Sequence, residues 1–297
     1  MAISDQLLSS LGSIICLGEV LWDIFPGKSR SLGGAPTNTC FHCLSLGHPT
    51  ALVSAVGKDQ EGDAILQKLQ QFGIATNWVY PDKNLPTGKA VVKIDPEGNP
   101  SYRISKKTAW DRILWSKDLE RLTNNAQVVC FGTLAQRHSV SRETIQRFLA
   151  SCRNARIRLL DLNLRGTHPQ KCVITESLAL SNMAKLNRPE FEIVCKIAGI
   201  ESGIPFDMRA QSIRQAFDLQ ILWITLGADG SMLATPKETL CQPAIQCPVI
   251  DTVGAGDAFC AGLLCGLSRN YPLPVTTRLA THLAARACSH QGAIPQI

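Results

Sequence analysis

The chain lacks a hydrophobic run long enough to cross a membrane, which takes roughly 18 consecutive apolar residues. Its first twenty residues, MAISDQLLSSLGSIICLGEV, also lack the basic start and the cleavage pattern of a secretory signal. The two absences argue against a membrane partner and predict a soluble, cytoplasmic protein.

Charge is scarce and unclustered. Charged residues are 18% of the 297, and 30 basic against 24 acidic residues give a net charge of +6 with no block of one sign. Nucleic-acid binders usually gather basic residues in a patch or stripe. The small excess therefore argues against a nucleic-acid partner and favours anionic small molecules.

Paired metal-binding cysteines are lacking as well, although the chain has twelve cysteines. They are scattered through apolar runs, and in a reducing cytosol we expect no structural disulfide. Cys40 and Cys43 form the one CxxC, with no second pair at zinc-finger spacing. We interpret them as buried thiols one helical turn apart, with a cysteine-based redox or metal protein as the alternative.

The sequence has neither a P-loop nor a dinucleotide-binding glycine motif. The GKS at 27–29 would need a glycine at position 22, where Trp22 stands, and in GAGDAF the last glycine of GxGxxG is replaced by Phe259. Any nucleotide must therefore bind without a P-loop lysine.

What the chain does have is alternation, with no repeat and no low-complexity linker. Apolar strand patterns alternate with amphipathic helix patterns, which predicts one α/β domain over 1–297 with a mostly parallel sheet. The strands are expected at 13–25, 49–57, 126–132, 156–163, 219–227 and 243–250. A glycine loop leading into a helix is expected within 32–47, with Pro36 near the first turn, and a second helix at 59–73. Residues 87–105 interrupt the alternation with a hairpin pattern around DPEGNP, which predicts a small flap over the main sheet.

The segment DTVGAGDAF, 251–259, joins a phosphate-binding pattern to an acid. Gly254, Ala255 and Gly256 precede a helix, whose first amides lack intrahelical partners and whose dipole is positive there. These features predict an anion hole. A carboxylate such as Asp257 beside this anion hole would repel phosphate. Its presence is explained if it accepts the proton of a hydroxyl that attacks the phosphoryl group. The alternative is that Asp257 only caps its helix.

DTVGAGDAFCAGLL resembles the C-terminal signature of the ribokinase-like (PfkB) carbohydrate kinase family, and LGGAPTN and GEVLWDIFP resemble its N-terminal ones. DLNLR, KLNRPE and ITLGADG fit family landmarks between them, so the resemblance covers nearly the whole chain. It implies a three-layer α/β/α sandwich with a β lid from about 24–37 and 85–108. It also implies an ATP-dependent kinase that uses Mg²⁺, with K⁺ in some members, and family lids often pair two subunits into a homodimer.

The resemblance also implies roles for single residues. Asp257 would be the general base, and the Gly254–Gly256 turn the anion hole. Sugar contacts would come from Asp23, Gly33, Gly34, Asn38, Arg103, Asn163 and Arg165. Nucleotide contacts would come from Thr225, Gly227, Gly230, Gly254, Gly256 and Asn187, with the adenine near GAIP at 292–295. Asn187 and Glu190 would position Mg²⁺ largely through water, and Asp251 a monovalent cation. Asn187 and Glu190 also match a helix-capping pair, and both readings stay open.

The opening motifs are closest to those of fructokinases of this family, which implies phosphorylation of D-fructose at its 6-hydroxyl. 2-Keto-3-deoxygluconate kinase and ribokinase are the alternatives within the family. A nucleoside kinase is less favoured, because the hairpin offers little aromatic surface beyond Tyr102. An alternative of another class is a non-catalytic paralogue that binds sugar or nucleotide and regulates a partner. The retained Asp257, Gly254 and Gly256 argue against it.

Overall fold

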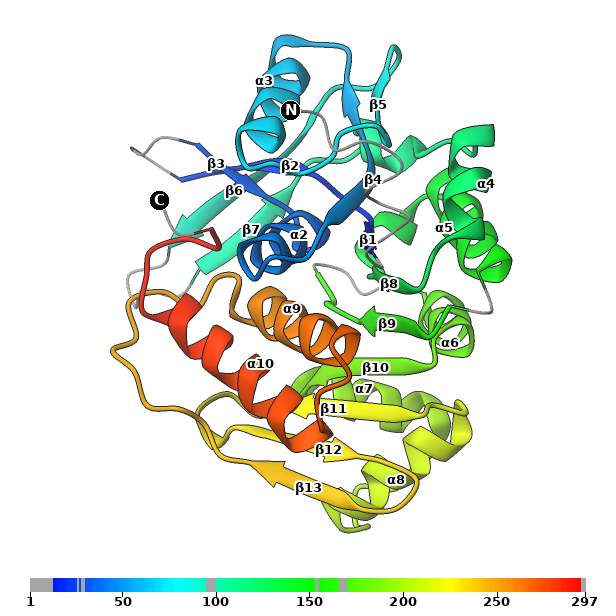
Figure 1. Cartoon of the computed structure of the whole chain (residues 1–297), viewed down its shortest axis with the longest axis vertical. Coiled ribbons are helices and arrows are strands. Elements are labelled where there is room, and N and C mark those ends of the chain that lie inside the picture. Colours follow the sequence, from blue (N-terminus) through cyan, green and yellow to red (C-terminus); the bar gives the residue numbers. More distant parts are fainter. Residues whose placement is uncertain are drawn as a thin grey trace.

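The computed structural model describes residues 13–25, 27, 30–94, 100–152, 155–165 and 170–294. Its centre is a nine-stranded sheet (Figure 1) in the order β13-β12-β11-β10-β9-β8-β1-β4-β5. All neighbouring strands pair parallel except β11 with β12 and β12 with β13, so the predicted mostly parallel sheet is confirmed. The bounds are β1 Ile14–Leu17, β4 Thr50–Gly57, β5 Val79–Asp82, β8 Val128–Phe131, β9 Ile157–Asp161, β10 Met183–Asn187, β11 Ile221–Thr225, β12 Ser231–Ala234 and β13 Thr239–Gln242.

Helices cover both faces of this sheet and complete the predicted three layers (Figure 1). One face is covered by α2 Ala35–Ser45, α3 Gln60–Gln71, α9 Ala255–Ser268 and α10 Leu273–Cys288. The other is covered by α4 Lys117–Asn124, α5 Ser139–Ser151, α6 Lys171–Leu180, α7 Arg188–Ala198 and α8 Phe206–Ala216. Among the described residues, no helix has the length and apolarity to cross a membrane.

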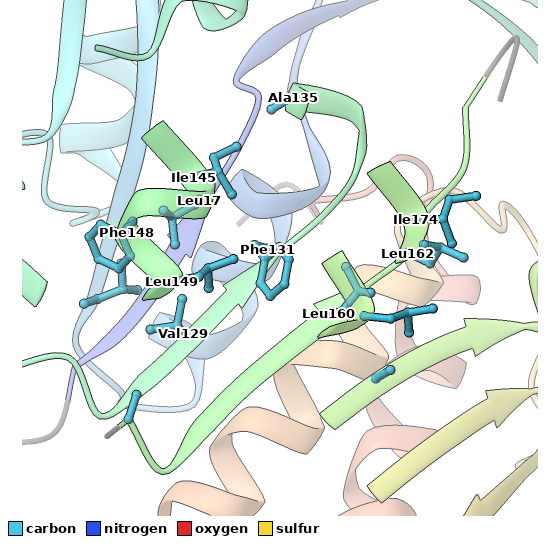
Figure 2. Packing of buried hydrophobic residues seen from close by; sticks show 14 of the residues in the cluster. Leu17, Val129, Phe131, Ala135, Ile145, Phe148, Leu149, Leu160, Leu162 and Ile174 are labelled. Atoms are coloured by element: carbon cyan, nitrogen blue, oxygen red, sulfur yellow. The ribbon is translucent and has the colours of Figure 1, made fainter. Parts of the chain in front are cut away.

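The central strands are apolar on both faces because both faces are covered. In β1, Ile15 and Leu17 face the α4–α8 layer, whereas Ile14 and Cys16 face the layer of α2 and α9. Figure 2 shows part of the first cluster, in which side chains of β1, β8 and β9 pack against α5 and α6. This packing holds the carboxyl ends of the strands at one edge.

The prediction of one strand over 13–25 is wrong. β1 ends at Leu17, and β2, Leu21–Ile24, belongs to a second sheet of four strands. Gly18 separates them with a φ of +149°, which an L side chain rarely adopts, and a Cβ there would lie 2.7 Å from Cγ of Pro36. The chain therefore leaves the main sheet at the edge where ligands bind in open α/β folds.

The small sheet has the order β3-β2-β6-β7, with β3 Ser31–Gly33, β6 Gly88–Ile94 and β7 Pro100–Ile104. β6 and β7 pair antiparallel, which confirms the predicted hairpin, and the turn at 95–99 lies outside the described residues. The sheet begins at 21, before the expected lid boundary at 24, and 35–37 belong to α2.

The prediction of a strand at 243–250 is also wrong, because β13 ends at Gln242 and the chain stays irregular until α9 begins at Ala255. Pro243 and Pro248 lack the N–H that a strand would donate to a neighbour. The helix with Asp257 is therefore approached by a loop.

We predict that Gly262→Ala destabilises the protein although alanine favours helices. A Cβ at 262 would collide with the Cα of Ala280, where α9 and α10 cross, so the helices must separate. We expect a loss of about 1–3 kcal/mol in the free energy of unfolding, measured by denaturant titration. Gly203→Ala is the control, since a Cβ there meets nothing within 4 Å. Equal stability of both variants would contradict the prediction.

Candidate active site

Two helix starts far apart in the sequence meet at the carboxyl edge of the sheet. Asn38, in the first turns of α2, donates from Nδ2 to Oδ2 of Asp257, in the first turn of α9, at 2.7 Å. Both residues are buried, with 4% and 6% of their surface exposed. The Asp257 carboxylate thus bonds another helix, which disfavours a role as the cap of its own.

Close packing favours glycine at the turn that starts α9 and requires it at Gly254. Gly254 is the N-cap with a φ of +79°, and a Cβ there would lie 2.6 Å from Cα of Ala293. A Cβ on Gly256 would lie 3.0 Å from Nζ of Lys185. The amide of Ala255 already donates to Thr252 O at 3.3 Å. The remaining first-turn amides lack intrahelical partners by helix geometry, as an anion hole needs.

The environment of Asp257 makes its carboxylate more basic than usual. Burial, and next the charge of Asp161, raise its pKa to about 6, while the hydrogen bond from Asn38 and the charges of Arg165 and Lys185 act to lower it. A group with a pKa near the working pH is suited to accept a proton.

Asp161 and Lys185, which the sequence analysis missed, form a buried ion pair at 3.0 Å beside this turn. Asp161 ends β9, and Lys185, in the middle of the parallel strand β10, is its register partner. Burial alone would lower the pKa of Lys185, but the charge of Asp161 and further groups raise it above the usual value. Lys185 therefore stays charged beneath Gly256. The signal in the sequence was one acid and one base in adjacent apolar strands.

Two further carboxyls face the same region. Burial raises the pKa of Asp23, on β2, to about 7, which Arg165 opposes and Asp257 reinforces. Burial also raises the pKa of Glu19 to about 7. Glu19 was missed by the sequence analysis; its Oε1 accepts from the amide of Ala35 at 3.2 Å, which ties it to the start of α2.

A pocket opens at the carboxyl ends of β8 and β9, beside the start of α2. Glu19 and Asp161 line it, and so does Asn163, one of the predicted sugar contacts, which has a φ of +41°. The other lining residues are Ala35, Pro36, Thr39, Cys130, Phe131, Gly132, Thr133 and Leu134.

The other predicted sugar contacts, and Asp257, are not among the residues that line this pocket. A Cβ on Gly34 would collide with the backbone carbonyl of Glu19, and its φ is +107°, so this position requires glycine. A Cβ on Gly33 would meet only the side-chain carboxylate of Asp23, so glycine there leaves room for that carboxylate. Arg165 is exposed, and its charge acts on Glu19, Asp23 and Asp257. Arg103 is exposed on β7, opposite Val91 in register, and its sugar contact stays a prediction.

The predicted nucleotide residues lie at the far end of the sheet. Thr225 ends β11 and donates from Oγ1 to Leu186 O at 3.4 Å. Gly227 (φ +63°) and Gly230 (φ +91°) form the turn between β11 and β12, and a Cβ on Gly230 would collide with Gln242 O. The turn thus accounts for both glycines, and their contacts to nucleotide stay predictions.

Asn187 and Glu190 form the helix-capping pair that was one of the two readings. Asn187 Oδ1 accepts from Glu190 N at 2.9 Å, and Glu190 Oε2 from Asn187 N at 2.8 Å. The other oxygen, Oε1, accepts from Leu164 N at 2.9 Å. Burial raises the pKa of Glu190, which Lys185 opposes. Both carboxylate oxygens of Glu190 thus already accept a hydrogen bond, and each has one further lone pair for another partner. This fits binding of magnesium through its water molecules and disfavours direct ligation of the ion.

Asp251, the predicted monovalent-cation residue, connects two loops. Its Oδ1 accepts from Val253 N at 3.0 Å and its Oδ2 from Gly292 N at 2.8 Å. The carboxylate therefore holds the approach to α9 against the segment that follows α10.

The cysteines of the CxxC, Cys40 and Cys43, are buried on α2, as predicted. Within the described part of the chain, no group of three or more His, Cys, Asp or Glu side chains is arranged to hold a metal ion.

The family model described as pfkB family carbohydrate kinase matches residues 26–297. The chain therefore belongs to the pfkB family and is a carbohydrate kinase. It is 28% identical over 284 residues to the fructokinase of Salmonella typhimurium, covering 92% of this chain and 90% of the relative. It is 27% identical over 272 residues to the aminoimidazole riboside kinase of the same species, covering 88% and 83%.

Among solved structures, the crystal structure of fructokinase with bound ATP from Xylella fastidiosa superimposes with a TM-score of 0.83 at 21% identity. The superposition covers 96% of this chain and 94% of that one, and at this identity it supports the fold alone.

We predict that Asn38→Ala moves the acid limb of the kinase pH profile to higher pH. The hydrogen bond from Asn38 lowers the pKa of Asp257, so its removal raises that pKa above about 6, and the carboxylate becomes protonated at higher pH than in the native protein. The measurement is kcat/KM between about pH 5 and pH 9, which reports groups of the free enzyme. Thr39→Val is the control, since among the described residues its hydroxyl has one hydrogen bond, to the backbone carbonyl of Asp257 at 3.5 Å, and none to the carboxylate. An unchanged acid limb in Asn38→Ala would contradict the assignment.

Proposed function

We propose that the protein transfers the γ-phosphate of ATP to the 6-hydroxyl of D-fructose, with Asp257 as general base and the Gly254–Gly256 turn as anion hole. The observation that carries the proposal is the buried Asp257 carboxylate, which lies in the first turn of α9 and is bonded by Asn38 from a second helix.

In the proposed reaction, Asp257 accepts the hydroxyl proton while the sugar oxygen bonds the γ-phosphorus and the bond from phosphorus to the bridging oxygen of ADP breaks. Asn38 occupies Oδ2 of Asp257, which leaves Oδ1 to accept the proton. A positioned base typically contributes about 10²–10⁴-fold. The amides after Gly254 would stabilise the charge on the phosphoryl oxygens, where loss of one donor costs about 10²–10³-fold in comparable sites.

Substrate hydroxyls have a specific place to bind in this arrangement. Oδ1 of Asn38 is buried and has no hydrogen-bond partner among the described residues. A buried acceptor without a partner is unfavourable, and a sugar hydroxyl would supply the missing donor. We assign the other sugar contacts to Asp23, Gly33, Gly34, Asn163, Arg165 and Arg103, and to Glu19, which the pocket adds.

We assign the nucleotide to the edge from Gly254 and Gly256 to Asn187, Thr225, Gly227 and Gly230. Magnesium would come with the phosphates, with Asn187 and Glu190 binding its water molecules, and would neutralise phosphate charge. Asp251 would hold the loop at which a potassium ion binds. We also propose that the small sheet is a lid on a single domain and the surface of a homodimer.

Fructose is favoured by the LGGAPTN and GEVLWDIFP motifs and by the fructokinase relative. The relative that acts on a riboside keeps nucleosides among the alternatives, together with ribose and 2-keto-3-deoxygluconate.

We predict that Asp257→Asn lowers kcat at least about 10²-fold and leaves the nucleotide Kd within about twofold, because it removes the proton acceptor and keeps the side-chain shape. The measurements are steady-state kinetics and calorimetric nucleotide binding. Asp118→Asn, in the exposed first turn of α4, is the matched control and should retain full activity. Near-normal turnover in Asp257→Asn would show that another group takes the proton.

A panel of acceptors tests the substrate assignment. ADP release is measured, and we expect kcat/KM to be highest with fructose. The values for ribose, glucose, 2-keto-3-deoxygluconate and adenosine should be at least about tenfold lower, and a tenfold difference corresponds to about 1.4 kcal/mol in activation free energy. A preference for another acceptor would reject fructose and leave the mechanism standing. No turnover with any acceptor would favour the non-catalytic paralogue.

A further inference from the structure

The hairpin of the small sheet (strands β2, β3, β6 and β7) joins the main domain through two short segments that lie side by side. The chain enters β6 through 86–88 and leaves β7 through 105–109, and Ala109 N donates to Pro86 O at 2.8 Å across the two. We call these segments the hinge. Its entry is held by Asp59, whose Oδ2 accepts from Thr87 N at 2.9 Å and whose Oδ1 accepts from Thr87 Oγ1 at 2.6 Å.

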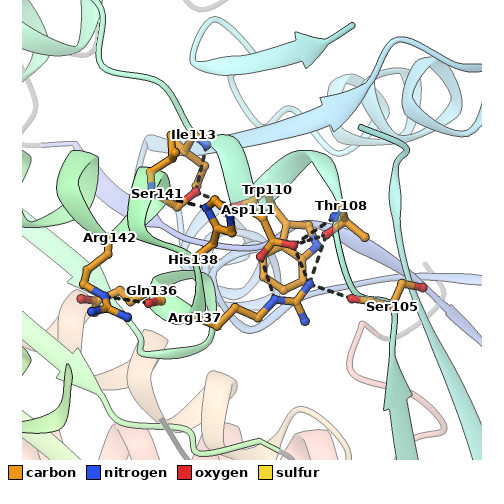
Figure 3. A network of polar contacts seen from close by, with 11 residues as sticks. Ser105, Thr108, Trp110, Asp111, Ile113, Gln136, Arg137, His138, Ser141 and Arg142 are labelled. Atoms are coloured by element: carbon orange, nitrogen blue, oxygen red, sulfur yellow. Dashed lines mark hydrogen bonds and ion pairs between the residues drawn. The ribbon is translucent and has the colours of Figure 1, made fainter. Parts of the chain in front are cut away.

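The exit of the hinge is held by one arginine (Figure 3). Arg137 donates from Nε to Asp111 Oδ1 at 2.7 Å and from the guanidinium nitrogen Nη2 to Asp111 Oδ2 at 2.8 Å. The same nitrogen donates to Ser105 O at 2.7 Å, directly after β7. Asp111 is 2% exposed and also accepts from Thr108 N at 2.9 Å, so the acid is engaged from both sides. Arg137 thus bonds the first residue after the hairpin and the turn that follows it.

Trp110 connects the two halves of the hinge. The guanidinium of Arg137 stacks over its ring, 3.8 Å from the ring centroid, and the ring is fully buried. On the entry side, a Cβ on Gly88 would collide with Nε1 of Trp110, so the first residue of β6 rests directly on the indole. Moving Arg137 would therefore disturb both the entry and the exit.

Arg137 comes from the wall of the pocket. It ends the short 3₁₀ helix Leu134–Arg137, and Gly132, Thr133 and Leu134, just before and at its start, line the pocket. Gln136 Nε2 donates to Gly132 O at 2.9 Å and makes this segment compact. One short segment thus reaches the pocket with one end and the hinge with the other.

We propose that Arg137 is a positioning residue that sets where the small sheet lies relative to the pocket and thereby the fit of the sugar. The proposal rests on the proposed function, since Asp23 and Gly33, assigned above as sugar contacts, lie on β2 and β3 of this sheet. β2 pairs with β6, so a displaced hairpin carries Asp23 with it. Displacements of about 1 Å far from the reacting atoms can cost on the order of 10²-fold in rate.

The test compares Arg137→Gln, Arg137→Lys and the double variant Arg137→Gln/Asp111→Asn, which leaves no unpaired buried charge. Arg142→Gln is the matched control, because Arg142 lies five residues on and donates to Gln136 O at 3.0 Å without reaching the hinge. Sugar KM, ATP KM and kcat are measured for each, together with amide hydrogen exchange of the small sheet by mass spectrometry.

We expect Arg137→Gln and the double variant to raise sugar KM about tenfold or more, with ATP KM within about twofold, and Arg137→Lys to recover part of the loss. Exchange should be faster in β6, β7 and β2 and unchanged in β8 and β9, and Arg142→Gln should behave as the native protein. Equal losses in sugar KM, ATP KM and kcat, or unchanged exchange in β2 and β6, would overturn the proposal. Hydrogen exchange needs no turnover. If exchange is faster but the protein phosphorylates no sugar, the proposed function is rejected, and so is the claim that Arg137 sets the fit of the sugar. The claim that Arg137 holds the hinge in place would then still stand.

Discussion

The hydrogen bond between Asn38 and Asp257 joins the starts of two helices 219 residues apart, and the site depends on it. It forms because α2 and α9 pack on the same face of the parallel sheet and point their first turns to the carboxyl edge of the strands. The glycine turn at 254–256 and the loop at 33–34 lie at the starts of these two helices, and Ala35, Pro36 and Thr39 of α2 line the pocket beside β8 and β9. Displacing either helix would separate Asp257, the proposed base, from the groups around it.

Several acids lie where an anion is expected to bind, and their negative charges would repel it. Burial reduces this repulsion in part. It raises the pKa of Asp257 to about 6 and those of Glu19 and Asp23 to about 7, so these acids carry less charge near neutral pH. Lys185 is paired with Asp161, so its charge is largely compensated. Attraction for phosphate would then come from the amides of α9 and from Arg165, while the acids face hydroxyls. The same turn can therefore hold both an acid and a phosphate.

Local patterns predicted most of the fold, because helix periodicity, glycine stops and apolar runs depend on neighbours in sequence. They failed where long-range packing decides. The run at 13–25 looks continuous, but Gly18 sends its second half into another sheet. Asp257 and Asn38 could be found from motifs, whereas the Asp161–Lys185 pair follows from the register of two strands and Glu19 from its bond to Ala35. Arg137 had no signal at all, since its partners lie 26 and 32 residues away.

The most direct measurement is a crystal structure of the protein with fructose and a non-hydrolysable ATP analogue. The account predicts that the 6-hydroxyl oxygen lies within about 2.6–3.2 Å of the Asp257 carboxylate, with the γ-phosphate on the amides that follow Gly254. A sugar whose hydroxyls contact Glu19 or Asp23 but leave Asp257 without a substrate contact, or a γ-phosphate bound away from the start of α9, would contradict it.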